Sequence, residues 1–273
     1  MNRPTRFHWT GDVAHYVDRP SVRLIEHVHV GRFGGNSASG QSKNEDGCLV
    51  WVHPEKEWEF AIVLDAHESS DSANAVIALI KQHETRLIEC LDDSFTSSYF
   101  AAFEQTVLGL FQSPAFLATC AALQGETACL LVVRKAQYVW WLSIGDCVCF
   151  LFHDELAAFH QYQLNQRQFY EWVGRVNTFN QPIPTYSRGV RELRAGTNRL
   201  LLVTDGILEC PGEPFARPEQ LYHALSGDLA QGVRKLLETI QRHGVRDSTT
   251  LVAWDCVNDL PATFAGNQSK SKT

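Results

Sequence analysis

The order of strand-like and helix-like segments predicts an α+β fold, in which helices pack outside paired antiparallel β-sheets. Short β-type runs come first, two helical stripes follow, and three more β-type runs are then joined by turns. The chain continues with a strand, two helices and a last strand. Strands and helices do not alternate one by one, which argues against a doubly wound parallel sheet. The sequence therefore predicts a central antiparallel β-sandwich flanked by pairs of helices on both sides.

Apolar patterning places the elements in the first part of the chain. Runs rich in β-branched and aromatic residues predict strands at 22–30, 47–52 and 60–64, separated by a Gly/Ser/Asn-rich stretch and by a polar turn. Apolar residues three and four positions apart predict helices at 72–91 and 99–110. Each helix would turn one apolar stripe towards a sheet.

The second part of the chain contains a meander of strands and then two helices. Short polar turns join the strands of the meander. A less regular stretch follows it, and within that stretch we expect a helix at 166–173. The expected strands are 127–133, 138–144, 148–152, 199–203 and 249–256, and the remaining expected helices are 218–225 and 229–240.

No internal repeat, low-complexity tract or composition break divides the chain, so residues 21–257 are predicted to form a single domain. Residues 1–20 show no periodicity and are expected to be an N-terminal extension outside this body. Residues 258–273 end in a polar tail with too little apolar surface to become ordered, and we expect disorder there.

Charge and hydropathy exclude several classes of protein. Lys and Arg total 24 against 31 Asp and Glu, and the formal net charge of −7 argues against partners such as nucleic acid or an anionic membrane. The N-terminus lacks the apolar run of a secretory signal. The longest apolar runs are strand-sized, far below the ~20 residues that cross a bilayer. We therefore expect a cytoplasmic protein.

Eight cysteines are scattered through mainly apolar stretches, and none forms a Cys-x-x-Cys pair. Free cysteine is among the most buried residue types, so we interpret them as reduced core residues. Zinc binding is the alternative. The one close pair, Cys147 and Cys149, has no Cys or His partner at a recognised zinc spacing, which disfavours that alternative.

Acidic residues stand at five expected strand ends. Ionised acids are costly to leave unpaired near a core, and only Lys43 and Arg246 are cations beside them in sequence, so a divalent ion is a natural partner if the acids converge. Carboxylate oxygens suit Mg²⁺ or Mn²⁺ rather than zinc. The alternative is that each acid is an ordinary turn former or cap. The acids are Glu45, Asp46, Asp65, Asp146, Asp205 and Asp247.

The order of these motifs resembles the metal-dependent serine/threonine phosphatases of type 2C, the PPM family. Six short segments carry the resemblance and span most of the predicted domain. Each segment is a weak signal alone, whereas six in the same order are a strong one. They are Asn44-Glu45-Asp46, the run from Phe60 to His67, Gly125-Glu126-Thr127-Ala128, Ile144-Gly145-Asp146-Cys147, the run from Leu201 to Ile207, and Arg246-Asp247-Ser248-Thr249-Thr250.

The resemblance implies a metal centre of two Mn²⁺ or Mg²⁺ ions with a weaker third. By position, Asp65 would bridge the two ions and Asp205 and Asp247 would complete one of them. Glu45 and the backbone carbonyl of Ala66 would hold the other. Asp46 would contact an ion directly or through a neighbouring ligand, and Asp146 with Asp205 would form the third site.

The activity implied by the resemblance is hydrolysis of phosphoserine and phosphothreonine in a phosphorylated protein substrate, in the service of signalling. A water bridging the two ions would attack the phosphoryl group in line, without a covalent phosphoenzyme. His67 resembles the family's candidate general acid, which would protonate the leaving oxygen. The alternative for His67 is a histidine that is simply hydrogen-bonded beside acids. Oligomeric state is not predicted.

The main departure from the family pattern concerns the substrate phosphate. Gln41 stands where the family usually has an Arg that grips the phosphate, so Lys43 is expected to supply a point charge without the forked geometry of Arg. Ala66, Cys147 and Ser248 replace a usual Gly, Ser and Asn. The missing Arg favours a rival hypothesis, a weak or inactive pseudophosphatase that acts as a phosphoprotein-binding regulatory module. A phosphatase of small molecules would share every motif.

Overall fold

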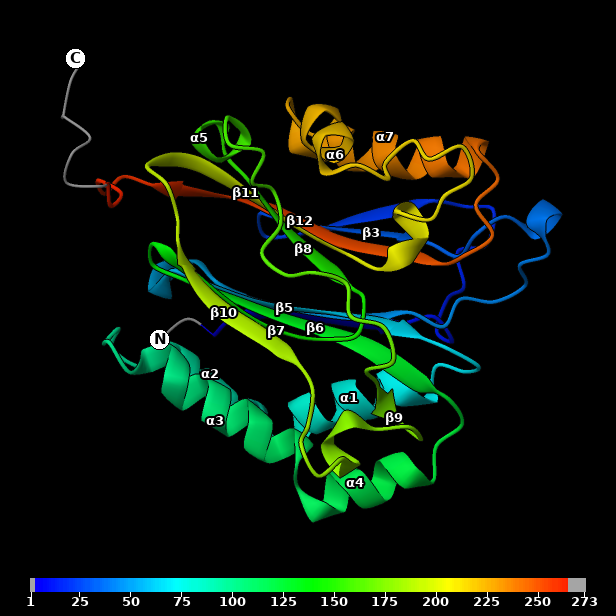
Figure 1. Ribbon diagram of the computed structural model, residues 1–273, viewed down its shortest axis with the longest axis horizontal. Helices are drawn as coiled ribbons and strands as arrows, with labels where there is room; N and C mark the ends of the chain where they lie inside the picture. Colours follow the sequence, from blue (N-terminus) through cyan, green and yellow to red (C-terminus); the bar gives the residue numbers. More distant parts are fainter. Residues whose placement is uncertain (1–2, 265–273) are drawn as a thin grey trace.

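Two antiparallel sheets lie face to face in the computed structural model, which describes residues 3–264 (Figure 1). The predicted α+β sandwich is confirmed. The first sheet runs β1 (Thr5–Thr10), β4 (Gly47–His53), β5 (Trp58–Ala66), β6 (Glu126–Lys135), β7 (Tyr138–Ile144) and β10 (Ser187–Glu192), with the short β9 (Val173–Gly174) paired to β6. The second sheet runs β2 (Ser21–Ile25), β3 (Val28–Phe33), β12 (Thr249–Asn258), β11 (Gly196–Val203) and β8 (Val148–Phe152).

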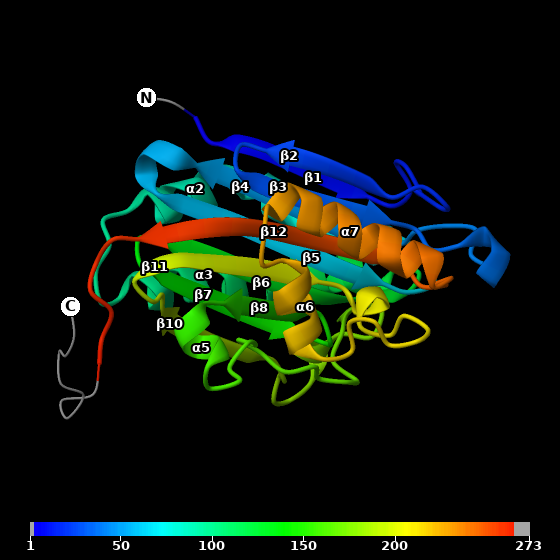
Figure 2. The same ribbon diagram turned by 90° about the horizontal axis from the view of Figure 1, so that it is seen from above.

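Helices cover the outer face of each sheet, and Figure 2 shows α7 lying along the strands of the second sheet. The first sheet is covered by α1 (Asp71–Gln82), α2 (Glu84–Asp92), α3 (Tyr99–Phe111) and α4 (Pro114–Ala121). The second is covered by α6 (Pro218–Ala224) and α7 (Leu229–Arg242), while α5 (Asp154–Ala157) follows β8. Residues 3–264 also contain four short 3₁₀ helices, which are η1 (Ser37–Ser39), η2 (Pro54–Lys56), η3 (Thr178–Asn180) and η4 (Asp205–Ile207).

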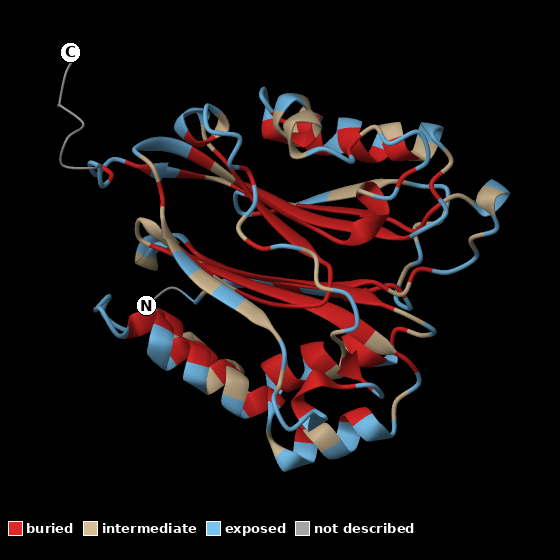
Figure 3. Ribbon diagram, viewed as in Figure 1, coloured by how far each residue is buried: buried red, intermediate tan, exposed pale blue. Residues whose placement is uncertain are grey.

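The central strands are buried on both faces, as Figure 3 shows. In β5, Phe60, Ile62 and Leu64 pack towards the helices, whereas Ala61 and Val63 pack towards the second sheet. Successive side chains of a strand point to opposite faces, so a strand covered on both sides reads as a continuous apolar run. This is why the expected strands were recognisable without a polar and apolar alternation.

Several expected boundaries differ from the structure. The predicted strand 22–30 is a hairpin whose turn includes Glu26 with φ of 54°, and the predicted helix 72–91 is two helices that meet at His83. Helix α4 was not predicted. The predicted helix 166–173 is wrong, because Asn165 accepts from the Cys149 N–H and donates to the Cys147 carbonyl, which holds this stretch against the β7–β8 hairpin in irregular form.

The N-terminal residues join the first sheet, contrary to the expectation that residues 1–20 lie outside the folded body. Strand β1 pairs antiparallel with β4 and buries Phe7 and Trp9 between the sheets. The guanidinium of Arg32 lies over the rings of Phe7 and Trp9. At the other end, residue 258 closes β12 and Ala262 is buried. The rest of the expected tail, 265–273, lies outside the described residues.

Two further findings concern the cysteines and the helices. All eight cysteines are free and seven of them are buried, which confirms that they are core residues. Among residues 3–264, no helix combines the length and the apolar character needed to span a bilayer.

The burial of β1 predicts that Trp9→Ala destabilises the whole domain. Removing a buried Trp side chain leaves a cavity between the sheets and costs about 3–5 kcal/mol. The measurement is the free energy of unfolding in urea. The control is Val13→Ala, because Val13 is 75% exposed and should change that free energy little. Equal stability of Trp9→Ala and wild type would show that the N-terminal strand is not part of the cooperative unit.

Candidate metal centre

The ends of five strands bring the predicted acids to one end of the sandwich. Asp46 directly precedes β4, Asp65 lies near the end of β5, and Asp146 lies in the turn between β7 and β8. Asp205 follows β11, and Asp247 precedes β12. The register aligns these ends, because Val203 at the end of β11 lies opposite the first residue of β8 and near the start of β12. Pairing in the two sheets therefore places residues that are far apart in sequence beside one another.

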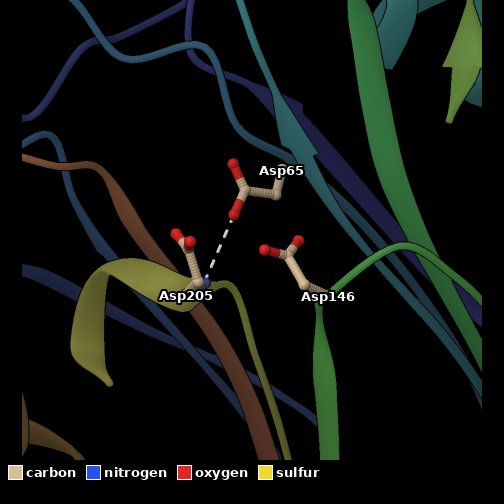
Figure 4. A group of neighbouring side chains, drawn as sticks. All are labelled: Asp65, Asp146 and Asp205. Carbon is tan, nitrogen blue, oxygen red and sulfur yellow. Dashed lines mark hydrogen bonds between the residues drawn. The ribbon is translucent and has the colours of Figure 1, made fainter. Parts of the chain in front are cut away.

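Three of the acids form a tight cluster (Figure 4). One carboxylate oxygen from each of Asp65, Asp146 and Asp205 lies within 4.8 Å of the others, and all three residues are buried. The backbone N–H of Asp205 donates to Asp65 Oδ2 at 3.2 Å. Buried Oδ1 atoms of Asp146 and Asp205 have no hydrogen-bond partner among the described residues. Unpartnered buried carboxylate oxygens that point to a common centre are suited to a cation.

Asp46 and Asp247 flank this cluster. Asp46 is buried, and its Oδ2 accepts from the hydroxyl of Thr204 at 3.1 Å. Asp247 is exposed to solvent, and its Oδ1 accepts from the backbone N–H of Ser248 at 2.8 Å. Both residues interact electrostatically with the acids of the cluster. Five carboxylates thus share one small region.

The electrostatics of this region favour a positive ion. Burial, reinforced by the neighbouring acids, raises the pKa of Asp205 to about 10 and raises the pKa values of Asp46 and Asp65 well above their usual range. The protein packed around Asp247 also raises its pKa. A divalent cation would reverse these shifts by stabilising the ionised forms. The donor set is carboxylate oxygen, which fits Mg²⁺ or Mn²⁺, and the residues present therefore fit a divalent metal centre.

Two glycines let the backbone reach this geometry. Gly145, in the turn that carries Asp146, has φ of +89°, which side chains rarely allow. Gly206 follows Asp205, and a Cβ there would lie 2.1 Å from the carbonyl oxygen of Ser248. Both positions belong to motifs on which the resemblance was based.

The residues expected at the substrate phosphate already have partners within the protein. Lys43 Nζ lies 2.5 Å from Glu45 Oε1 and donates to the carbonyl of Glu68 at 2.7 Å. The Gln41 side-chain oxygen accepts from the backbone N–H of Ser42 at 3.0 Å. Glu45 is therefore neutralised by Lys43, and neither Lys43 nor Gln41 is linked to the acid cluster by a hydrogen bond among the described residues.

Ala66 and His67 stand where the first sheet meets the cluster. Ala66 is the last residue of β5 and does not have a positive φ, so replacement of the usual Gly causes no backbone strain. The backbone N–H of His67 donates to the Glu126 carbonyl at 2.8 Å. The His67 ring packs edge-on against Trp172, with 5.2 Å between ring centroids, and interacts electrostatically with Asp247.

One residue of the cluster was missed in the sequence. Arg167 Nη2 donates to Asp146 Oδ2 at 3.1 Å, to Asp205 Oδ2 at 3.0 Å and to Glu209 Oε1 at 2.6 Å. Arg167 lies in the irregular stretch before β9, 21 residues from Asp146 and 38 from Asp205. No local motif marks it, so only the folded structure reveals this contact.

Comparison with known proteins finds similar structures but no match by sequence. No protein-family model matches the chain, and no curated protein sequence matches it. A variant of a bacterial serine phosphatase aligns with a TM-score of 0.62 and 12% identity, covering 86% of this chain and 99% of that one. This chain shares the fold of serine phosphatases. That shared fold agrees with the resemblance seen in the motifs.

Two further matches were solved with metal ions. The catalytic domain of the serine/threonine phosphatase PstP in complex with two manganese ions aligns with a TM-score of 0.53 and 17% identity, over 94% of this chain and 100% of that one. RsbX in complex with magnesium aligns with a TM-score of 0.54 and 13% identity, over 87% of this chain and 100% of that one. The fold is therefore one that also occurs in metal-binding proteins.

The raised pKa of Asp65 predicts that Asp65→Asn stabilises the metal-free protein at neutral pH. A carboxyl whose pKa is higher in the folded state opposes folding as the pH rises above its unfolded value, and Asn removes that effect while keeping an oxygen for the Asp205 N–H. We expect Tm to rise by about 2–4 °C for each kcal/mol of stabilisation. The measurement is thermal unfolding in a chelator between pH 4 and 8, and the difference should shrink at the acidic end.

We expect Mn²⁺ to raise the Tm of the wild type and to raise it less in Asp65→Asn, because this variant lacks the carboxylate that is expected to bind both ions. The matched control is Asp93→Asn, which neutralises an exposed acid at the end of α2. A metal-free Asp65→Asn protein that is less stable than wild type at every pH would contradict this account of the cluster.

Proposed function

We propose that the protein is a metal-dependent protein serine/threonine phosphatase, a phosphoric monoester hydrolase. The observation that supports it most is the convergence of Asp65, Asp146 and Asp205, with unpartnered buried oxygens on two of them, at the strand ends of a phosphatase fold. Buried carboxylates this close together repel one another, and a bound cation offsets that repulsion.

The residues proposed to hold the metal are those at the strand ends. Asp65 would be shared between two ions of Mn²⁺ or Mg²⁺, with Asp205 and Asp247 on one side and Glu45 with the Ala66 carbonyl on the other. Asp46 would support this arrangement from within the core, where Thr204 fixes its orientation. Bound ions of this type polarise phosphoryl oxygens and lower the pKa of a coordinated water.

The residues around the metal centre would perform the remaining steps. His67 lies at the end of β5 beside the acids, and its packing against Trp172 fixes its ring. In that place it would donate a proton to the serine or threonine oxygen as the phosphoryl group departs. The acids of the cluster are buried, whereas Asp247 is exposed to solvent.

The substrate proposed is a phosphorylated protein, because the structurally similar proteins include serine and serine/threonine phosphatases. Gln41 and Lys43 would bind its phosphate weakly, since Lys43 is paired with Glu45 and Gln41 carries no charge. This weak phosphate site is the observation that favours the second candidate, a regulatory module that binds phosphoproteins without turnover. Free buried cysteines suit a reducing compartment, and we place the activity in the cytoplasm.

The decisive measurement is hydrolysis of p-nitrophenyl phosphate and of a phosphothreonine peptide with added Mn²⁺. Asp205→Asn should reduce kcat by about 100-fold or more, because loss of one ligand weakens stabilisation of the transition-state charge by several kcal/mol. Asp255→Asn serves as control, since Asp255 pairs with Arg199 on β11 away from the cluster. No turnover by wild type with bound Mn²⁺ would reject the enzyme in favour of the binding module.

Because Gln41 stands where the family usually has an Arg, placing an Arg there should increase the affinity for the substrate phosphate. Gln41→Arg should lower KM for the phosphopeptide by about tenfold, because a charge-assisted, forked contact to phosphate adds one to two kcal/mol over a neutral amide. The measurement is steady-state kinetics of wild type, Gln41→Arg and Gln41→Lys, the last of which adds charge without the fork. An unchanged or higher KM for Gln41→Arg would contradict this explanation.

A further inference from the structure

Arg167 binds the acid cluster and has no role in the function proposed above. Its nitrogen Nη2 contacts Asp146, Asp205 and Glu209 together, at 3.1, 3.0 and 2.6 Å. The two aspartates offer Oδ2 to Arg167, whereas the unpartnered oxygens are their Oδ1 atoms. In each aspartate, one carboxylate oxygen therefore accepts from the guanidinium and the other has no hydrogen-bond partner among the described residues.

The fold holds Arg167 in this place rather than leaving it on a flexible surface. The neighbouring Gln168 donates its backbone N–H to the carbonyl of Gly145, directly before Asp146. Asn165 is hydrogen-bonded to the same β7–β8 hairpin through Ser143 and Cys147. The guanidinium also packs 5.0 Å from the ring centre of Phe169, and the Arg167 side chain is 23% exposed.

The guanidinium of Arg167 offsets part of the negative charge of the acid cluster. Asp46, Asp65, Asp146, Asp205 and Asp247 carry five negative charges when all are ionised. Two divalent ions and one guanidinium carry five positive charges, which balance the five aspartates, while Glu209 adds one further negative charge beside Arg167. A third divalent ion held by Asp146 and Asp205 would lie within a few ångströms of Nη2 whichever carboxylate oxygens it used, and two cations at that separation repel strongly.

We propose that Arg167 is a resident cation of the metal centre, which occupies the position between Asp146, Asp205 and Glu209 and limits the centre to two divalent ions. The inference rests on the proposed metal centre and adds to it. It replaces the earlier expectation that Asp146 and Asp205 form a third ion site in this chain. Arg167 is accordingly a positioning residue, which also orients the free oxygens of both aspartates.

The test is the number of Mn²⁺ ions bound per chain, measured by equilibrium dialysis with elemental analysis and by isothermal titration calorimetry. Wild type should bind two ions. Arg167→Gln should bind one more at the same free Mn²⁺ concentration, with at least a tenfold lower Kd for the last ion, and Arg167→Gln combined with Asp146→Asn should return to two. Arg167→Lys keeps the charge and should also bind two. The matched control is Arg175→Gln, an exposed arginine on the same connection.

A second variant separates the charge of Arg167 from its contact with Glu209. Glu209→Gln removes only the most exposed partner of Arg167, since the Glu209 side chain is 52% exposed, and should still bind two ions, because Arg167 keeps its charge and its contacts with both aspartates. If Arg167→Gln fails to fold, Arg167→Leu removes the charge while keeping an apolar side chain beside Phe169, and it should bind the additional ion. Two ions in wild type and in the folded charge-removing variant would overturn the role of Arg167 while leaving the metal centre intact. Three ions in wild type, the last one lost in Asp146→Asn, would also overturn it. Binding of no Mn²⁺ by any folded variant would reject the metal centre itself.

Discussion

The interaction on which the site depends is repulsion among carboxylates that the fold holds together out of water. A buried carboxylate without a partner protonates or destabilises the fold, and several in contact do both. The raised pKa values of Asp46, Asp65 and Asp205 express this cost directly. Positive charge is therefore required at this end of the sandwich. In the proposed function, the metal ions that supply this charge also take part in the reaction.

The β-sandwich is what prevents the cluster from relaxing. Strands β5, β11 and β12 are buried on both faces, and their register is fixed by the pairing of the two sheets. Shifting a strand by one residue would turn its core side chains to the wrong face, so the acids at the strand ends cannot move apart cheaply. Thr204 illustrates the rigidity, since its hydroxyl binds Asp46 and accepts from the N–H of Thr250.

The positive charges near the cluster differ from those expected from the family resemblance, which places an Arg at position 41. Arg167 reaches the acids from the connection before β9, whereas Lys43 is taken up by Glu45. Identities of 12–17% to proteins of the same fold show how freely the sequence has varied around a common burial pattern. Such a fold needs apolar residues of suitable size at the right period, and many sequences meet that condition.

Local patterns in the sequence were sufficient for the fold class, most of the strands and helices, and the acids at the strand ends. Apolar periodicity and motif order can be read along the chain because each depends on neighbouring residues. Helix α4 shows where local patterns become insufficient. Its N-cap Ser113 and Pro114 are helix-start signals in the sequence, but a helix of eight residues is too short to show a clear apolar period. Pairing of β1 with β4 and the contact of Arg167 with Asp146 and Asp205 were decided only by tertiary structure. These contacts join residues tens of positions apart, whose proximity is set by packing of the whole domain and leaves no local signal.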